Sequence, residues 1–202
     1  MSGTSAERSP RLLPSELHSP RVPARVSTDG LETAWGERWE SAGTYAFDRT
    51  AQRHEVFSID TPPPTVSGSL HVGHVFSYTH IDVVVRFQRM RGKAVFYPMG
   101  WDDNGLPTER RVQNYFGVRC DPTLPYDPDF EPPHTGGEGK SIKARDQVPV
   151  SRRNFVELCE RLTVEDEKQF EALWRRLGLS VDWSHTYQTI GERARKVAQT
   201  AF

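Results

Sequence analysis

Hydrophobic and polar residues follow one another along the chain in a pattern that predicts a strand, a helix and a second strand in succession. Apolar positions alternate over residues 55–60 and form a continuous run over residues 94–97, as is typical of short strands. Between them, apolar residues recur at near-helical spacing from about Leu70 to Met90, and Gly92 follows as a natural helix terminator. This order predicts a βαβ unit, which implies parallel strands joined by a right-handed crossover.

Helical patterns also flank this unit. The expected helices lie at residues 31–39, at residues 106–115, in two stretches after residue 150, and from residue 191 onward. Thr163, followed three residues later by Asp166, predicts a capping box at the start of the second stretch, which Gly178 ends. Residues 181–190 predict a strand or a hairpin. Because a doubly wound nucleotide-binding fold needs about five strands and fewer are evident, the pattern predicts an incomplete α/β fold with a parallel sheet.

The chain is expected to divide into four segments. Residues 1–28 contain Ser, Pro and Arg without periodicity and predict a flexible N-terminal arm. Residues 29–120 contain the βαβ unit. Residues 121–150 are rich in Pro, Gly and Asp and predict a long surface excursion. No regular element is expected over residues 119–150. Residues 151–202 are mainly helical.

Composition and charge exclude several classes of protein. The chain has 202 residues, of which 36% are hydrophobic, and its formal net charge of −1 excludes a wholly basic nucleic-acid coat. Residues 86–119 nevertheless hold seven basic and three acidic residues, an excess that suits either bound phosphates or ordinary solvated helix ends. With no run near the ~18 apolar residues of a membrane span and no secretory signal, we expect a cytoplasmic protein without a membrane partner. Cys120 and Cys159 form no CxxC pair, so we expect neither a disulfide partner nor a metal site.

The most specific local motif is His71-Val72-Gly73-His74, at the start of the long helix. A helix N-terminus binds anions because its backbone N–H groups are unpaired and the helix dipole is positive there. Two histidines add donors near the same anion, and Gly73 lets a flat ring approach the backbone. The combination favours phosphoryl chemistry on a nucleotide. The alternatives are two histidines on a solvated helix face, or half of a metal site for which no third ligand follows.

Polar residues also follow the second strand, within Met99–Glu109. Because ligands of open α/β sheets sit beyond the carboxyl ends of the strands, this segment and the histidine motif are expected to face one site. Asp102 or Asp103 suits an ammonium group or a sugar hydroxyl there, unless the two serve as a helix cap or turn. Trp101 is expected to pack in the core. Residues 136–141 (GGEGKS) imitate the end of a phosphate loop but lack its first glycine and a preceding strand, so we interpret them as a flexible loop.

Several separated motifs resemble class I aminoacyl-tRNA synthetases. Residues 62–74 read PPPTVSGSLHVGH, and residues 96–118 read FYPMGWDDNGLPTERRVQNYFGV. HVGH resembles the HIGH signature of that class, and the three prolines before it are more similar to the valyl branch than to the isoleucyl or leucyl branches. Residues 178–190 (GLSVDWSHTYQTI) resemble the region that precedes the editing insertion of that branch. The resemblance covers about residues 33–202.

This resemblance implies a Rossmann-type catalytic core that activates valine with ATP and Mg²⁺ and then charges tRNA(Val), with no tightly bound cofactor. His71 and His74 would stabilise the α-phosphate, and Gly73 would lie against adenine. The implied amino-acid-binding residues are Pro62, Pro63, Thr65 and Asp102. Of these, Asp102 would hold the α-ammonium group of valine, and the two prolines would shape a small apolar pocket.

The sequence also departs from the pattern of that family. Thr65 stands where the family usually has Asn, and Ser67 where it usually has Thr. The lysine signature KMSKS does not occur in the 202 residues, and residues 140–143 (KSIK) only superficially resemble it. Three hypotheses therefore stay open. The chain is the HIGH-motif half of a valyl-branch synthetase that ends before the editing domain, or it is a catalytically silent fragment or binding module. The third hypothesis is a small HxGH nucleotidylyltransferase, which the low number of expected strands opposes. We expect the isolated chain to be a monomer or an aggregation-prone fragment without activity of its own.

Overall fold

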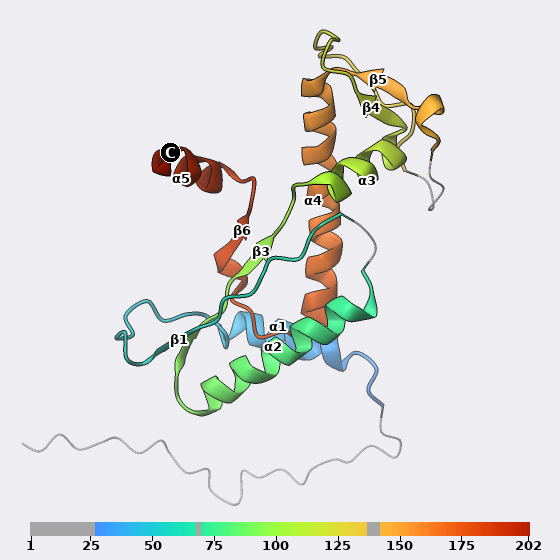
Figure 1. The fold of residues 1–202 in the computed structure, drawn as a ribbon. Coiled ribbons are helices and arrows are strands. Elements are labelled where there is room, and N and C mark those ends of the chain that lie inside the picture. Colours follow the sequence, from blue (N-terminus) through green and yellow to red (C-terminus); the bar gives the residue numbers. More distant parts are fainter. Residues whose placement is uncertain (1–26, 68–69, 137–141) are drawn as a thin grey trace, which may run out of the picture. The chain divides into compact units, whose positions relative to one another are not determined.

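The computed structural model describes residues 27–67, 70–136 and 142–202, of which residues 32–202 belong to one unit (Figure 1). The helices are α1 (Leu31–Ser41), α2 (Val72–Met90), α3 (Leu106–Phe116), α4 (Arg152–Arg176) and α5 (Glu192–Ala201), with short 3-10 turns η2 (Ala144–Asp146) and η3 (Trp183–His185). The strands are β1 (Val56–Ser58), β2 (Ala94–Phe96), β3 (Met99–Trp101), β4 (Val118–Cys120), β5 (Val148–Val150) and β6 (Thr186–Gln188). Most of the expected N-terminal arm, residues 1–26, and most of the Gly-rich loop, residues 137–141, lie outside the described residues.

The predicted βαβ unit is confirmed. β1 and β2 pair in parallel, with Phe57 opposite Val95, and α2 connects them in the chain. Gly92 follows the helix with a φ of +81°, a conformation that L side chains rarely adopt, and the chain then turns into β2. The three strand pairs of the described residues are all parallel, so the fold class is α/β as predicted.

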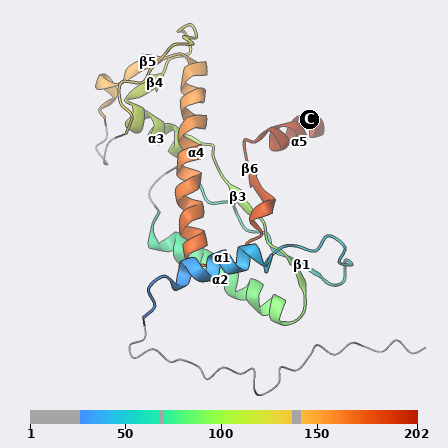
Figure 2. The ribbon, with the colours of Figure 1, turned by 180° about the vertical axis from the view of Figure 1, so that it is seen from behind.

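The two further pairs, β3–β6 and β4–β5, join segments that lie far apart in the sequence (Figures 1 and 2). Met99 lies opposite Thr186 in the first pair. β6 confirms a strand within residues 181–190, but the hairpin alternative is wrong because the partner of β6 is β3. The expectation of no regular element over residues 119–150 is also wrong, since β4 ends there and η2 and β5 follow. The apolar positions of β4 and β5 are too few to distinguish a strand from the surrounding loop, so only their pairing identifies them.

The two helices expected after residue 150 are one continuous helix, α4. Ser151 is its N-cap, and the Ser151 hydroxyl accepts a hydrogen bond from the Asn154 N–H at 3.2 Å. Thr163 caps nothing, because its hydroxyl donates to carbonyl groups one turn earlier in the same helix at 3.1 Å. Asp166, expected to complete a capping box, instead forms an ion pair with Arg111 of α3. Buried positions recur at helical spacing on both sides of Thr163, so one helix buries them all.

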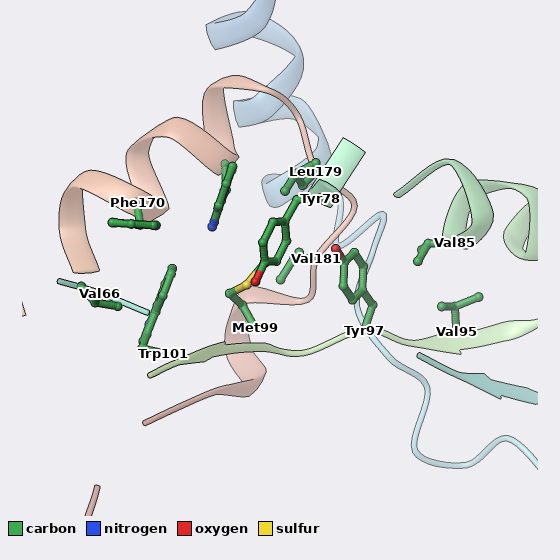
Figure 3. Packing of buried hydrophobic residues seen from close by; sticks show 11 residues of the cluster. Val66, Tyr78, Val85, Val95, Tyr97, Met99, Trp101, Phe170, Leu179 and Val181 are labelled. Carbon is green, nitrogen blue, oxygen red and sulfur yellow. The ribbon is translucent and has the colours of Figure 1, made fainter. Parts of the chain in front are cut away.

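Buried hydrophobic residues form two clusters that share α4. The first cluster joins the βαβ unit, β3 and the C-terminal half of α4; Figure 3 shows Phe170 of α4 beside Trp101 of β3. Trp101 therefore packs in the core, as predicted. The second cluster joins α3, β4, β5 and the N-terminal half of α4, and its buried members are Val112, Phe116, Val118, Val150, Phe155, Leu158 and Leu162.

Four of the seven basic residues between residues 86 and 119 have partners within the fold. The pairs are Arg86 with the Asp82 carboxylate, Arg89 with the Ser180 carbonyl, Lys93 with the His54 carbonyl, and Arg111 with the Asp166 carboxylate. Asp82 is buried, and a buried carboxylate needs such partners. Arg86 Nε lies 2.6 Å from Oδ2 of Asp82, and the Ser180 N–H donates to its Oδ1 at 2.8 Å. Much of the local basic excess thus stabilises the fold.

Candidate active site

The histidine motif forms the N-terminal cap of α2. His71 is the N-cap residue, in an extended conformation, and its Nδ1 accepts a hydrogen bond from the Gly73 N–H at 3.1 Å. Nδ1 of His74 accepts in turn from the His71 N–H over a longer distance of 3.4 Å. The two ring centroids are 4.0 Å apart. This reciprocal cap satisfies backbone donors that a helix start otherwise leaves open, so it fixes both rings at the helix end.

The cap also determines where each histidine carries its proton. Because Nδ1 of each ring is an acceptor, each neutral imidazole carries its proton on Nε2. Burial, and then the neighbouring charge of His71, lowers the pKa of His74 from 6.5. His74 is therefore neutral at pH 7. Its Nε2–H is a hydrogen-bond donor beside the positive end of a helix of 19 residues.

Gly73 is required by the ring that caps it. A Cβ atom at this position would lie 2.9 Å from both Cε1 and Nδ1 of His71, closer than real Cβ atoms approach other atoms. A larger residue at position 73 would displace the His71 ring and break its hydrogen bond with the backbone N–H of that position. The structure of the cap alone therefore explains why position 73 is glycine, without any bound ligand.

The proline segment and the end of β3 form a short parallel ladder. The Asp102 N–H donates to the Pro64 carbonyl at 3.0 Å, and the Val66 N–H donates to the Asp102 carbonyl at 2.9 Å. Thr65 lies directly opposite Asp102 in this ladder. The structure therefore brings together two of the predicted site residues, Thr65 and Asp102, from separate parts of the sequence.

Two hydroxyl groups hold the Asp102 carboxylate. Thr65 donates to Oδ2 at 3.2 Å, and Thr189, which directly follows β6, donates to Oδ1 at 3.3 Å. The N-cap of α3 is Gly105, which makes no side-chain cap bond, so neither Asp102 nor Asp103 is the cap of that helix. Asp102 is half-buried. A carboxylate held in this way at the end of a parallel strand suits a small cation such as an ammonium group.

Pro62 is fixed from the side of α2. The Tyr78 hydroxyl donates to the Pro62 carbonyl at 2.7 Å, and the Tyr78 ring stacks on Trp174 of α4 with centroids 4.7 Å apart. Burial raises the pKa of Tyr78 above its usual value, so the hydroxyl remains a donor. The Pro62 side chain is exposed and that of Pro63 is half-buried. The first two prolines thus lie on a segment that two helices hold in place.

Phe170 of α4 connects the two motifs. Its ring meets the His74 ring edge-on, with centroids 5.5 Å apart, and the Trp101 ring with centroids 6.4 Å apart. Phe170 is 1% exposed. The helix start with the histidines and the strand end with Asp102 therefore adjoin through one buried aromatic side chain.

A second carboxyl group, that of Asp103, is buried beside the first. Asp103 is 3% exposed, and within the described part of the chain its side-chain oxygens accept from no N–H or O–H group. The carboxyl groups of Asp103 and of Glu167 on α4 are close neighbours, and that of Glu167 also accepts from Gln188 Nε2 at 2.7 Å. Burial, followed by the charges of Glu167 and Asp102, raises the pKa of Asp103 to about 7. Two carboxyl groups in such contact favour one shared proton.

Sequence reasoning missed Thr189, Glu167 and Phe170 as parts of this site. Thr189 reaches Asp102 across 87 positions of sequence, through the β3–β6 pairing. The resemblance of residues 178–190 implies no role for Thr189, and no pattern singles out Glu167 or Phe170. A lone hydroxyl, carboxylate or ring is indistinguishable in sequence from an ordinary surface or core position. Only the strand pairing and the course of α4 bring them to Asp102 and His74.

The described residues offer neither a membrane-spanning helix nor a metal-binding cluster. In residues 27–67, 70–136 and 142–202, no helix combines the length and the apolar character needed to cross a bilayer. No group of three or more His, Cys, Asp or Glu side chains in the same residues is arranged to hold a metal ion.

Comparison with known families assigns this arrangement to a class. Residues 34–123 match the family described as tRNA synthetases class I (I, L, M and V). That stretch includes both the histidine motif and Asp102. Together with the parallel α/β fold, the match makes this part of the chain similar to the class I tRNA synthetases.

Within this class, the chain is similar to valine–tRNA ligases. It is 71% identical to that of Leifsonia xyli subsp. xyli over 185 residues, which are 90% of this chain and 22% of the relative. It is 69% identical to that of Bifidobacterium longum and 68% identical to that of Thermobifida fusca, in each case over 90% of this chain and 20% of the relative. The chain thus spans about one fifth of the length of the relatives it matches.

A solved structure supports the fold. The chain resembles the agnB2 LeuRS of Agrobacterium radiobacter K84, solved as a ternary complex with tRNA and LeuAMS, with a TM-score of 0.59 and 22% identity. The likeness covers 85% of this chain and 16% of the LeuRS chain. At this identity it shows a common fold and no more.

Proposed function

We propose that the chain supplies the ATP- and valine-binding part of a valine–tRNA ligase, which forms valyl-adenylate and transfers the valyl group to tRNA(Val). The observation that carries the proposal is the reciprocal cap of His71 and His74, which provides two Nε2–H donors at the N-terminus of α2. Phe170 contacts both His74 of this cap and Trp101, the residue that precedes Asp102. The identity to valine–tRNA ligases, 71% in one case, supports the choice of amino acid.

The two histidines would act on the α-phosphate of ATP. In adenylate formation a carboxylate oxygen of valine bonds to the α-phosphorus, the bond from this phosphorus to the bridging oxygen breaks, and pyrophosphate leaves with the electron pair. Negative charge on the non-bridging oxygens is stabilised by fixed donors, which need no reorganisation when the reaction occurs. The Nε2–H groups of His71 and His74, together with the positive end of α2, are suited to this role. We propose that adenine lies against the Gly73 backbone, next to the His71 ring that occupies the space of a Cβ atom there.

Asp102 would bind the α-ammonium group of valine. Its two oxygens are already oriented by the hydroxyls of Thr65 and Thr189, so the ammonium group meets a fixed carboxylate. Pro62 and Pro63 would form one wall of the side-chain pocket. An apolar pocket discriminates a single methylene group by only about 1–3 kcal/mol, so we expect incomplete rejection of near-isosteric amino acids at this step.

The proposed substrates are valine, ATP with Mg²⁺ and tRNA(Val). Mg²⁺ would enter as part of the nucleotide substrate, since class I synthetases generally use ATP with this ion. We further propose that the protein acts in the cytoplasm as a monomer.

Valine-dependent exchange of pyrophosphate into ATP tests this proposal. Residues 1–202 joined to the remaining sequence of the Leifsonia xyli ligase should catalyse the exchange. His74→Ala should lower its kcat by about 10²–10³, the usual cost of removing one fixed donor to a developing oxyanion. His80, exposed on the same helix, offers the matched control, and His80→Ala should retain the activity. Full exchange by the His74→Ala enzyme would contradict the phosphate role, and a preference for isoleucine or leucine would contradict the valyl assignment.

The 202-residue chain alone tests the two other hypotheses. We expect no valine-dependent exchange from it, as for a binding module that needs further residues to act. A nucleotidylyltransferase would instead exchange pyrophosphate in the presence of another nucleotidyl acceptor, such as a phosphate monoester, and without valine. Valine-dependent exchange by the chain alone would show that no further residues are needed.

A further inference from the structure

Thr189 is placed by backbone pairing next to Asp102. Its N–H donates to the Trp101 carbonyl at 3.0 Å, which continues the β3–β6 ladder by one residue. Its side chain is half-buried. The backbone therefore holds Thr189 in position whether or not its hydroxyl has partners.

The Thr189 hydroxyl has three partners, and they fix the direction of its proton. It accepts from the Asp103 N–H at 3.2 Å and from Nδ2 of Asn104 at 3.3 Å. A hydroxyl has two acceptor positions and one donor. With both acceptor positions engaged, the single proton is directed to Oδ1 of Asp102, 3.3 Å away.

The opposite oxygen of Asp102 is held from the other side. Thr65, in the segment that pairs with the end of β3, donates to Oδ2 at 3.2 Å. Without Thr189 the carboxylate would keep one hydroxyl partner and regain rotation about its Cβ–Cγ bond. With both hydroxyls, one orientation is favoured before any ligand arrives.

We propose that Thr189 is a positioning residue, whose hydroxyl orients the Asp102 carboxylate for the α-ammonium group of the amino-acid substrate. This inference rests on the proposed role of Asp102 and adds the residue that follows β6 to that site. Thr189 itself touches no reacting atom. Its loss should therefore weaken amino-acid binding and leave the step on the phosphate nearly unchanged.

The test uses the joined enzyme described above, with Thr189→Val, which keeps the side-chain shape and removes the hydroxyl. We expect the KM for valine to rise about tenfold, as for loss of one hydrogen bond to a charged group. The kcat and the KM for ATP should stay within about twofold of the parent, and Thr189→Ser should restore the KM for valine to within about threefold. Thr186, exposed on the same strand, is the matched control, and Thr186→Val should behave as the parent.

The outcomes separate this inference from the function on which it rests. No valine-dependent exchange by the parent joined enzyme would refute the proposed function and, with it, the role of Thr189. Exchange by the parent together with an unchanged KM for valine in Thr189→Val would refute the role of Thr189 alone. An equal rise in the KM for ATP, or a fall in kcat without a change in KM, would indicate a purely structural role and would also overturn it. Because KM does not depend on the fraction of folded enzyme, partial misfolding of the variant does not disguise the result.

Discussion

Replacing Asp103 with Asn should remove much of the pH dependence of stability. The folded protein holds a proton on Asp103 up to a pKa of about 7, against 3.8 for the ordinary carboxyl. The groups facing it are Glu167 and Asp102, both acidic, and Glu171 faces Glu167 in turn. A raised carboxyl pKa means that the folded state binds the proton more tightly than the unfolded state. The free energy of unfolding is therefore highest below about pH 4, falls as the pH rises to about 7, and is level above it.

The size of this effect follows from the two pKa values of Asp103. A difference of about 3 units at 1.36 kcal/mol per unit gives a loss of about 4 kcal/mol between pH 4 and pH 7. Asn is close to the protonated carboxyl in shape and cannot ionise. We therefore expect the Asn variant to be more stable than the parent by roughly 2 kcal/mol at pH 5, and by about 4 kcal/mol at pH 8.

Urea unfolding of the 202-residue chain, followed by tryptophan fluorescence at half-unit steps from pH 5 to pH 8, measures this difference. Trp101 and Trp174 are buried in the first cluster, so their emission reports its loss. The control is Asp129→Asn, at an exposed carboxylate, and its stability should run parallel to that of the parent. Parallel curves for Asp103→Asn and the parent would show that Asp103 and Glu167 hold no shared proton, and would refute the reasoning.

Two further substitutions test the packing around α4. Arg111→Ala leaves Asp166 buried without its cation and should lower the free energy of unfolding by about 3 kcal/mol. Arg110→Ala, at an exposed position, is the control and should change it by less than about 0.5 kcal/mol. Similar losses for both variants would contradict the ion pair. Phe170→Ala removes a ring that is 1% exposed and should lower the free energy of unfolding, measured in urea, by about 3–5 kcal/mol. Val164→Ala, on the exposed side of the same helix, should lower it by less than about 1 kcal/mol. A small loss at Phe170 would show that the first cluster does not depend on this ring.

The sequence predicts the local part of this fold well. The βαβ unit, α1, α3 and the course of α2 all follow from periodicity and from Gly92, because each of those signals lies within the element it defines. The β3–β6 and β4–β5 pairs do not follow, because their partners are remote in sequence and too few apolar positions mark β3, β4 and β5. The division of α4 into two helices came from a capping pattern at Thr163. That pattern is outweighed by apolar positions that continue through it.

The candidate site was predictable to the same extent. His71, Gly73, His74 and Asp102 stand in contiguous motifs, and the structure gives each of them a defined geometry. Thr189 lies within residues 178–190, whose resemblance implies no site role for it, and its contact with Asp102 exists only once β6 has paired with β3. What the sequence cannot supply is the set of partners that orient a motif residue.

α4 has a consequence for how the site stays ordered. Over its 25 residues, about 37 Å, it provides walls for both hydrophobic clusters. Neither cluster can lose its packing without freeing part of the helix that the other needs, so the two should melt as one cooperative unit. Leu158 lies about 18 Å along the helix from Phe170, whose ring rests on His74. A substitution at Leu158, which takes no part in the site, can therefore loosen His74 and reduce activity without touching any substrate.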